Sequence, residues 1–195
     1  GWALTGTPAD CVRAGLLYLM PDCDMVISGI NLGANLGTDC NYSGTAAAAR
    51  EAVMNGRAAM AVSCAIRPGE KWCFRDAVYL AEYAVKVMEQ LAAHPLPRGV
   101  FLNLNLPNLM RGKDFHPGAA PLGWFRCDRD FDVEDRGDEV IFRCRFGTIA
   151  HRQEGHSDIA LMREGRACMT AVSWDATHAA SNAVAEEIAG RMTEK

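Results

Sequence analysis

Residues 25–49 read MVISGINLGANLGTDCNYSGTAAAA and contain the pattern that decides the fold. The apolar run from Met25 to Ile27 is typical of a strand that is covered on both faces of a sheet. A glycine-rich segment follows, and the alanine-rich stretch from Ser43 to Asn55 then predicts a helix that Gly56 ends in a left-handed cap. A strand, a loop and a helix in this order are typical of a parallel α/β unit.

The same alternation continues on both sides of this unit. Upstream, Thr7 suits the N-cap of a helix and Pro8 suits its first position. Downstream, we expect a buried strand at residues 58–65, a helix at 74–93 and a strand at 100–106. The sequence therefore predicts the α/β fold class, with a doubly wound and mostly parallel sheet.

The second half of the chain changes character. Charged residues crowd together from residue 126 to residue 146, and this range ends in a β-prone run after the turn-forming Arg136-Gly137-Asp138. We expect a β-hairpin extension at 126–146 within a single domain that spans 1–195. Residues 177–192 predict a C-terminal helix.

Composition excludes several classes of protein. The chain has 195 residues, with 20 Lys and Arg against 24 Asp and Glu, and its formal net charge of -4 argues against a basic protein that binds a nucleic-acid duplex. Its apolar stretches fall well short of the ~20 residues that cross a bilayer, so we expect no membrane segment. The 8 cysteines form no Cys-x-x-Cys pair. This pattern predicts a reducing compartment, the cytoplasm.

The glycine-rich segment and the helix after it predict a ligand site at the carboxyl edge of the sheet. Asn31 and Asn35 offer amide groups that bind a hard cation through oxygen or a phosphate through nitrogen, and Gly33 lets backbone approach an anion. Ser43-Gly44-Thr45 opens a helix whose first amides favour a phosphate. All of these residues are also ordinary turn and capping residues, and Ser43 could simply be an N-cap.

Five blocks of the sequence together resemble the SurE family, in the order that the family has them. They are TGTPADCV (5–12), SGINLGANLG (28–37), YSGT (42–45), AVS (61–63) and LNLNLP (102–107). The resemblance implies a Rossmann-like core and a phosphatase that acts on nucleoside 5′- and 3′-monophosphates. It also implies a divalent metal ion, Mg²⁺ or Mn²⁺, and a homodimer or tetramer assembled through the hairpin and a C-terminal exchange. Residues 157–160 and 169–173 match more loosely.

The resemblance also assigns site residues. Asn31 matches the family's asparagine metal ligand, and a set of five residues matches positions around the phosphate. That set is Gly33, Asn35, Ser43, Gly44 and Thr45. The family's aspartate pair, in an Asn-Asp-Asp-Gly motif, and a serine ligand have no counterpart here, because the N-terminal strand-helix-strand segment that carries the metal ligands is absent from this chain. We expect that a longer protein supplies this segment. The catalytic residue is unknown, although Asp39 remains a possible ligand.

Two alternatives stay open beside the metal-dependent phosphatase. The chain could bind a phosphate or a nucleotide without catalysis, or it could be a subunit whose partner completes the metal site. Neither a Gly-x-Ser-x-Gly elbow nor a clear histidine dyad occurs in the sequence, so attack by a metal-bound water suits the residues best.

Overall fold

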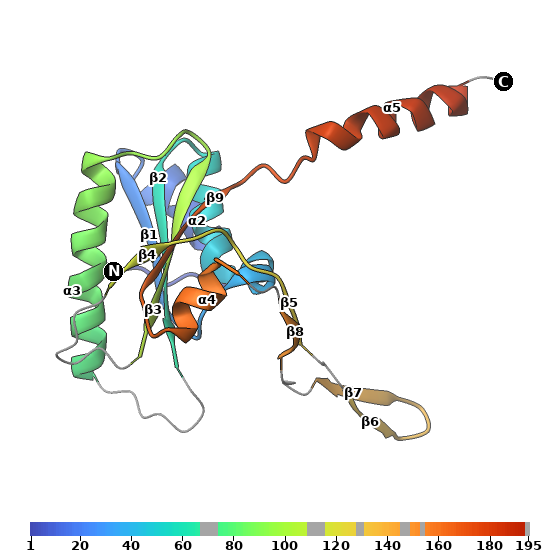
Figure 1. Ribbon diagram of the computed structural model, residues 1–195, viewed down its shortest axis with the longest axis horizontal. Coiled ribbons are helices and arrows are strands. Elements are labelled where there is room, and N and C mark those ends of the chain that lie inside the picture. The colour runs from blue at the N-terminus through green and yellow to red at the C-terminus, as the bar shows by residue number, and fades with distance from the viewer. Residues whose placement is uncertain (67–73, 109–115, 128–130, 145–148, 153–154, 194–195) are drawn as a thin grey trace.

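The computed structural model describes residues 1–66, 74–108, 116–127, 131–144, 149–152 and 155–193. A central sheet carries helices on both faces, and two projections leave this body, one formed by strands and one by the C-terminal helix (Figure 1). The elements in chain order are α1 Pro8–Ala14, η1 Gly15–Leu19, β1 Met25–Leu32, η2 Gly37–Asn41, α2 Gly44–Met54, β2 Ala58–Ala65, α3 Phe74–Ala93, β3 Val100–Pro107, β4 Gly118–Ala119, β5 Phe125–Cys127, β6 Phe131–Asp135, β7 Val140–Cys144, β8 Ile149–Arg152, α4 Asp158–Arg163, β9 Cys168–Ser173 and α5 Ala179–Thr193.

The strands of the central sheet follow the order β1-β2-β3-β9-β4. β1, β2 and β3 are parallel to one another, β9 is antiparallel to β3, and β4 is parallel to β9. The prediction of an α/β fold with a mostly parallel sheet is therefore confirmed.

β1 is longer than predicted, and one of its apolar side chains is more exposed than predicted. It extends to Leu32 rather than ending at Ile27, and the side chain of Ile27 is 42% exposed. The expectation of a strand covered on both faces is wrong at this position, because the buried residues of α3 pack on β2 and β3, while β1 lies beyond them at the end of the sheet.

Alanine-rich α2 packs on one face of the sheet. Ala46, Ala49 and Ala52 are fully buried against Ala61 of β2 and Phe101 of β3. Small side chains on both elements let the helix lie close to the sheet. The helix also begins and ends as predicted, with Ser43 as its N-cap and with Gly56 at a φ of +76° after it.

The longer helix α3 covers the opposite face. Its buried stripe consists of residues spaced three or four apart, as expected for an amphipathic helix. These are Leu80, Ala84, Val87 and Leu91. They pack against β2 and β3 through Met60, Val62, Leu104 and Leu106. Because the two helices cover opposite faces, the sheet is doubly wound.

The N-terminal helix begins as the sequence predicts. The Thr7 hydroxyl accepts a hydrogen bond from the Asp10 backbone N–H, and the Asp10 carboxylate accepts one from the Thr7 N–H at 2.9 Å. This reciprocal pair satisfies two amides that a helix start leaves unpaired. From Gly15 the helix continues as a π-helical turn, and it ends at Leu19, before Pro21.

Strands β5 to β8 form a projection that we call the arm. β5 pairs with β8 next to the body, and β6 pairs with β7 in a hairpin beyond them (Figure 1). The hairpin turns at Arg136, Gly137 and Asp138, as the sequence predicts. Residues 128–130 and 145–146 of the predicted extension lie outside the described residues.

The C-terminal helix α5 leaves the body after β9 and extends away from it (Figure 1). It runs from Ala179 to Thr193, close to the predicted bounds. Its three large apolar side chains, Val184, Ile188 and Met192, are all more than half exposed. Within the described ranges, no helix has the length and apolar character that crossing a membrane requires.

Candidate functional site

The predicted site residues lie at the carboxyl edge of the parallel strands. Asn31 is close to the carboxyl end of β1, and α2 begins at Gly44. Because α2 connects β1 to the parallel strand β2, its first turn lies at the edge where β1 ends. The topology therefore brings Asn31 and the start of α2 to one edge of the sheet.

Asn31 is held in place by the loop that follows it. Its Nδ2 donates a 2.8 Å hydrogen bond to the Gly33 carbonyl, so Oδ1 is the atom left to bind a cation. Gly33 has a φ of +127° and donates its own N–H to the Cys64 carbonyl of β2 at 2.8 Å. The Gly33 amide is thus used to attach the loop to the sheet, while its role near a phosphate stays a prediction.

The Asn35 side chain points toward the sheet, and the hydrogen bonds of this residue attach the loop to β2 and β3. Its Nδ2 donates to Ser63 Oγ at 2.6 Å, and its backbone N–H donates to Asn105 Oδ1 at 2.8 Å. Its carbonyl accepts from Nδ2 of Asn103 at 2.9 Å and from Nδ2 of Asn105 at 3.1 Å. We call these four residues the amide network. All four are buried. Asn103 and Asn105 are two positions apart on β3, so their side chains lie on the same face of the sheet, the one that α2 covers.

At the start of α2, some backbone N–H groups are hydrogen-bonded within the protein and others are left for solvent or a ligand. Ser43 Oγ accepts a hydrogen bond from the Ala46 N–H at 3.0 Å, so Ser43 is the N-cap of α2. The first hydrogen bond of the helix ladder runs from the Ala47 N–H to the Ser43 carbonyl. The N–H groups of Gly44 and Thr45 precede that ladder, which leaves them to solvent or to an anion.

Sequence reasoning missed Ser63, Asn103, Asn105 and Asp158 as parts of this region. The buried carboxylate of Asp158 accepts from the Gly37 N–H in the loop at 2.7 Å. For Asn103 and Asn105 the sequence did contain a signal, because two asparagines inside an apolar strand need hydrogen-bond partners when they are buried. Asn103 Oδ1 is the one buried side-chain oxygen or nitrogen without a hydrogen bond in the described ranges.

The residues present fit only part of a metal site. The Asn31 carboxamide offers one neutral oxygen, whereas Mg²⁺ and Mn²⁺ favour carboxylate ligands. Among the described residues there is no group of three or more His, Cys, Asp or Glu placed to hold a metal ion. A complete cage would need ligands from outside this set.

Cysteine nucleophiles do not suit this edge. Burial raises the pKa of the Cys40 thiol, which lies in η2 between Asn35 and α2. Burial also raises the pKa of Cys168 in β9 to about 11. Both thiols are therefore protonated at neutral pH, and a thiolate is the form that attacks.

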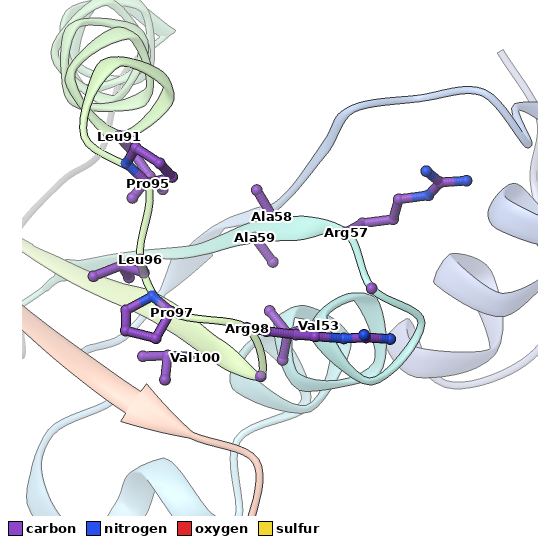
Figure 2. Close-up of a pocket in the computed structure, with 12 residues that line it drawn as sticks. Val53, Arg57, Ala58, Ala59, Leu91, Pro95, Leu96, Pro97, Arg98 and Val100 are labelled. Carbon is purple, nitrogen blue, oxygen red and sulfur yellow. The ribbon is translucent and has the colours of Figure 1, made fainter.

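A separate cavity of about 230 Å³ lies at the opposite, amino-terminal edge of the sheet (Figure 2). Its apolar lining includes Val53 at the end of α2, Leu91 near the end of α3 and Val100 at the start of β3. Arg57 and Arg98 flank it, and Arg57 donates to the Pro21 carbonyl at 2.6 Å. The C-terminal ends of α2 and α3 both border this cavity.

Comparison with known proteins identifies the family to which the chain belongs. A profile of the family described as "Survival protein SurE" matches residues 1–119, which include β1, the loop, α2, β2 and β3. The chain belongs to the SurE family. The arrangement of Asn31 and the start of α2 is thus part of a SurE-family fold.

Two similar relatives, each named 5′-nucleotidase SurE, cover most of the chain. The protein from Desulfatibacillum aliphaticivorans is 48% identical over 178 residues, which are 90% of this chain and 68% of the relative. The protein from Desulforamulus reducens is 36% identical over 180 residues, 91% of this chain and 68% of the relative. The chain thus spans about two thirds of the length of these relatives.

A solved structure agrees with the fold. The crystal structure of the SurE protein from Aquifex aeolicus superposes with a TM-score of 0.73 at 26% sequence identity, over 90% of this chain and 70% of that one. Because it covers 90% of this chain, the structural match extends past residue 119, where the family match ends.

Proposed function

We propose that this chain carries the phosphate-binding part of a phosphatase that hydrolyses nucleoside monophosphates with a divalent metal ion, Mg²⁺ or Mn²⁺. The observation that carries the proposal is that Asn31 and the first turn of α2 lie at the same edge of the sheet. The names of the two relatives, 5′-nucleotidase SurE, support the substrate class. Activity on 3′-monophosphates rests on the sequence resemblance alone.

In this proposal each residue has a separate task. The N–H groups of Gly44 and Thr45 bind the phosphate, with the positive end of the α2 dipole behind them. Asn31 Oδ1 provides one oxygen ligand, and the Gly33 carbonyl fixes its orientation through Nδ2. Gly33 and Asn35 keep the loop close to the sheet, so that the amides and Asn31 stay in a fixed geometry.

Magnitudes show why these residues need a metal ion. Phosphate-monoester hydrolysis can require acceleration of ~10²¹-fold, or about 28 kcal/mol. A charge at a helix end contributes only about 0.3 to 1 kcal/mol. A divalent ion held partly by Asn31 would supply the larger share, because it would polarise the phosphoryl oxygen and lower the pKa of a water.

The test is release of inorganic phosphate from AMP, GMP and 3′-AMP with Mn²⁺ or Mg²⁺, measured on the protein in its longest form so that carboxylate ligands from outside these residues are included. We expect turnover that EDTA abolishes and that Asn31→Ala reduces at least about 100-fold, in the range found for single groups that act on the transition state. Asn55→Ala is the matched control, because Asn55 is an exposed asparagine at the other end of α2. Equal rates for Asn31→Ala and the unchanged chain would refute the proposed role of Asn31.

A second candidate is a nucleotide-binding protein without catalysis. It is favoured by the finding that the described residues hold no three-member group of His, Cys, Asp or Glu. Calorimetric binding of AMP without phosphate release would support it. The third candidate, a subunit that a partner chain completes, instead gives activity only after mixing with a chain that contributes carboxylates.

We further propose that the chain assembles as a homodimer or tetramer. Val184, Ile188 and Met192 are spaced four residues apart and form one exposed apolar stripe on α5. A projecting helix takes most of its stability from packing, so a second copy is a suitable partner for this stripe. Light scattering should give a mass of two or four chains, and Ile188→Asp should lower it. The cytoplasmic location stays a prediction.

A further inference from the structure

Asp158, the first residue of α4, lies where three segments of the chain meet. Its side chain is fully buried. Oδ2 accepts a hydrogen bond from the Gly37 N–H at 2.7 Å, and Oδ1 accepts bonds from the N–H groups of Gly123 and Ile159, each at 2.8 Å. Hydrogen bonds to an ionised carboxylate are roughly twice as strong as bonds between neutral groups. One carboxylate therefore joins the site loop to the segment that leads into the arm.

The backbones of these two segments also touch directly. Gly37 has a φ of +50°, and a Cβ built on it would lie 2.6 Å from the Gly123 carbonyl oxygen. One residue further on, Thr38 Oγ1 donates to the Phe125 carbonyl at 2.9 Å, at the first residue of β5. Gly37, Thr38, Gly123, Phe125 and Asp158 thus form a clamp between the loop and the base of the arm.

The clamp has consequences at the predicted site. Gly37 lies between Asn35, which is fixed to β2 and β3, and Ser43, which caps α2. The amide network holds the loop on one side of Gly37, and the clamp holds it on the other side. The position of the α2 start relative to Asn31 therefore depends on both attachments.

We propose that Asp158 is a positioning residue that couples the arm to the site loop, so that the way the arm is held sets the geometry of Asn31 and the start of α2. The proposal deepens the proposed phosphatase function and rests on it for its catalytic consequence. It also has a purely structural consequence, a shared stability of the loop and the arm base, which can be measured without any activity.

Asp158→Asn is the main test variant, because it keeps the shape but removes the charge and turns one acceptor into an NH₂ group that faces a backbone N–H. Thr38→Val is the second variant, since it removes only the bond to β5 and should fold even if the first does not. Asp135→Asn is the control: Asp135 also accepts a backbone N–H, from Gly137 at 2.9 Å, but it lies on the arm beyond the clamp.

Hydrogen exchange gives the first readout. In both variants we expect the backbone amides of residues 33–43 and of residues 120–125 to exchange at least about ten-fold faster. The exchange rates of β2 and β3 should stay the same. The effects of the two substitutions should be less than additive in the double variant, because both release the same clamp. Faster exchange confined to 120–125 and α4, with 33–43 unchanged, would overturn the proposal.

Kinetics give the second readout. For AMP with Mn²⁺ we expect kcat of Asp158→Asn to fall about 10- to 100-fold, with KM changed much less, because a misplaced group lowers the rate of the chemical step. The kinetics of the control Asp135→Asn should match those of the unchanged protein. A change in KM alone would contradict a positioning role. If the longest form of the protein, without substitutions, has no phosphatase activity, the proposed function fails, while the exchange experiment still decides whether the clamp exists.

Discussion

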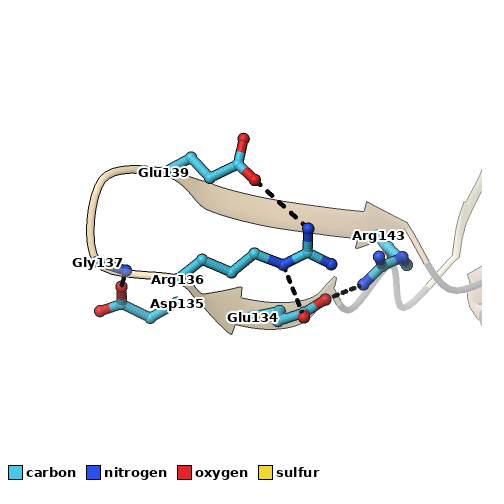
Figure 3. A network of polar contacts seen from close by, with 6 residues as sticks. All are labelled: Glu134, Asp135, Arg136, Gly137, Glu139 and Arg143. Atoms are coloured by element: carbon cyan, nitrogen blue, oxygen red, sulfur yellow. Dashed lines mark hydrogen bonds and ion pairs between the residues drawn. The ribbon is translucent and has the colours of Figure 1, made fainter.

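The amide network under the site loop and the ion network on the arm use similar numbers of polar groups in opposite surroundings. Asn35, Ser63, Asn103 and Asn105 are neutral and buried, and their hydrogen bonds join residues 28 to 70 positions apart. On the hairpin, Glu134 is 2.8 Å from Arg136 and 2.7 Å from Arg143, and all three are exposed (Figure 3). A lost buried partner leaves an unsatisfied group, whereas water replaces a lost exposed one.

The largest expected effect of a single substitution is that of Asn105→Ala. It leaves the Asn35 N–H without its acceptor in a buried position and removes one of two donors to the Asn35 carbonyl. We expect the free energy of unfolding to fall by about 2 to 4 kcal/mol. Urea denaturation followed by circular dichroism measures this loss. A loss as small as that of the exposed Asn55→Ala would remove the distinction between the two networks.

Gly37→Ala should have the next largest effect. Alanine is disfavoured at the φ of +50°, and its Cβ would meet the Gly123 carbonyl. We expect a loss of about 1 to 3 kcal/mol, by strain and by crowding. Thermal unfolding measures it, and Gly137→Ala is the control, since Gly137 has a φ of +84° but open space around it. Equal losses for the two variants would show that only the φ matters and that the close approach to Gly123 contributes nothing.

These two predictions also show what could be obtained from the sequence and what could not. α3 spans residues 74–93 and β2 spans 58–65, as predicted, because periodicity and length decide such elements locally. Asn31, Gly44 and Thr45 are candidates from the sequence because they lie next to a predicted strand end and helix start, and their roles stay predictions. Asp158 was not, because its partner Gly37 is 121 positions away and no local pattern indicates that contact.

Polar residues inside predicted strands were the missed signal. Asn103 and Asn105 interrupt an apolar run, and their burial could be predicted from β3 itself. Their partner could not, because the Asn35 backbone reaches them only after the loop folds back over the sheet. A buried amide predicts that some partner exists but does not identify it.

A smaller effect is expected at high pH in the body of the protein. Burial raises the pKa of Cys168 to about 11, while the thiol of an unfolded chain titrates near 9. Between these two values the unfolded chain releases a proton that the folded chain keeps, so stability falls as pH rises through this window. Urea midpoints from pH 8 to pH 11 should fall less for Cys168→Ala than for the unchanged chain. Parallel curves would mean that Cys168 does not contribute to this loss.

The smallest effect is expected on the hairpin of the arm, at low pH. Hydrogen bonds from Arg136 and then Arg143 hold the pKa of Glu134 below its usual value of 4.5. The folded hairpin therefore favours the charged carboxylate, and this contribution is present above pH 4.5 and is lost as pH falls through the lower, folded pKa.

Proton chemical shifts of Phe131 and Phe142, whose rings meet edge to face 6.2 Å apart, report the hairpin between pH 6 and pH 3. We expect a pH-dependent shift that Glu134→Gln removes and that high salt weakens, because the pairs are exposed and screened. A shift that persists in Glu134→Gln would assign the titration to another group, and the exposed network would then contribute even less to the hairpin than the comparison with the buried network implies.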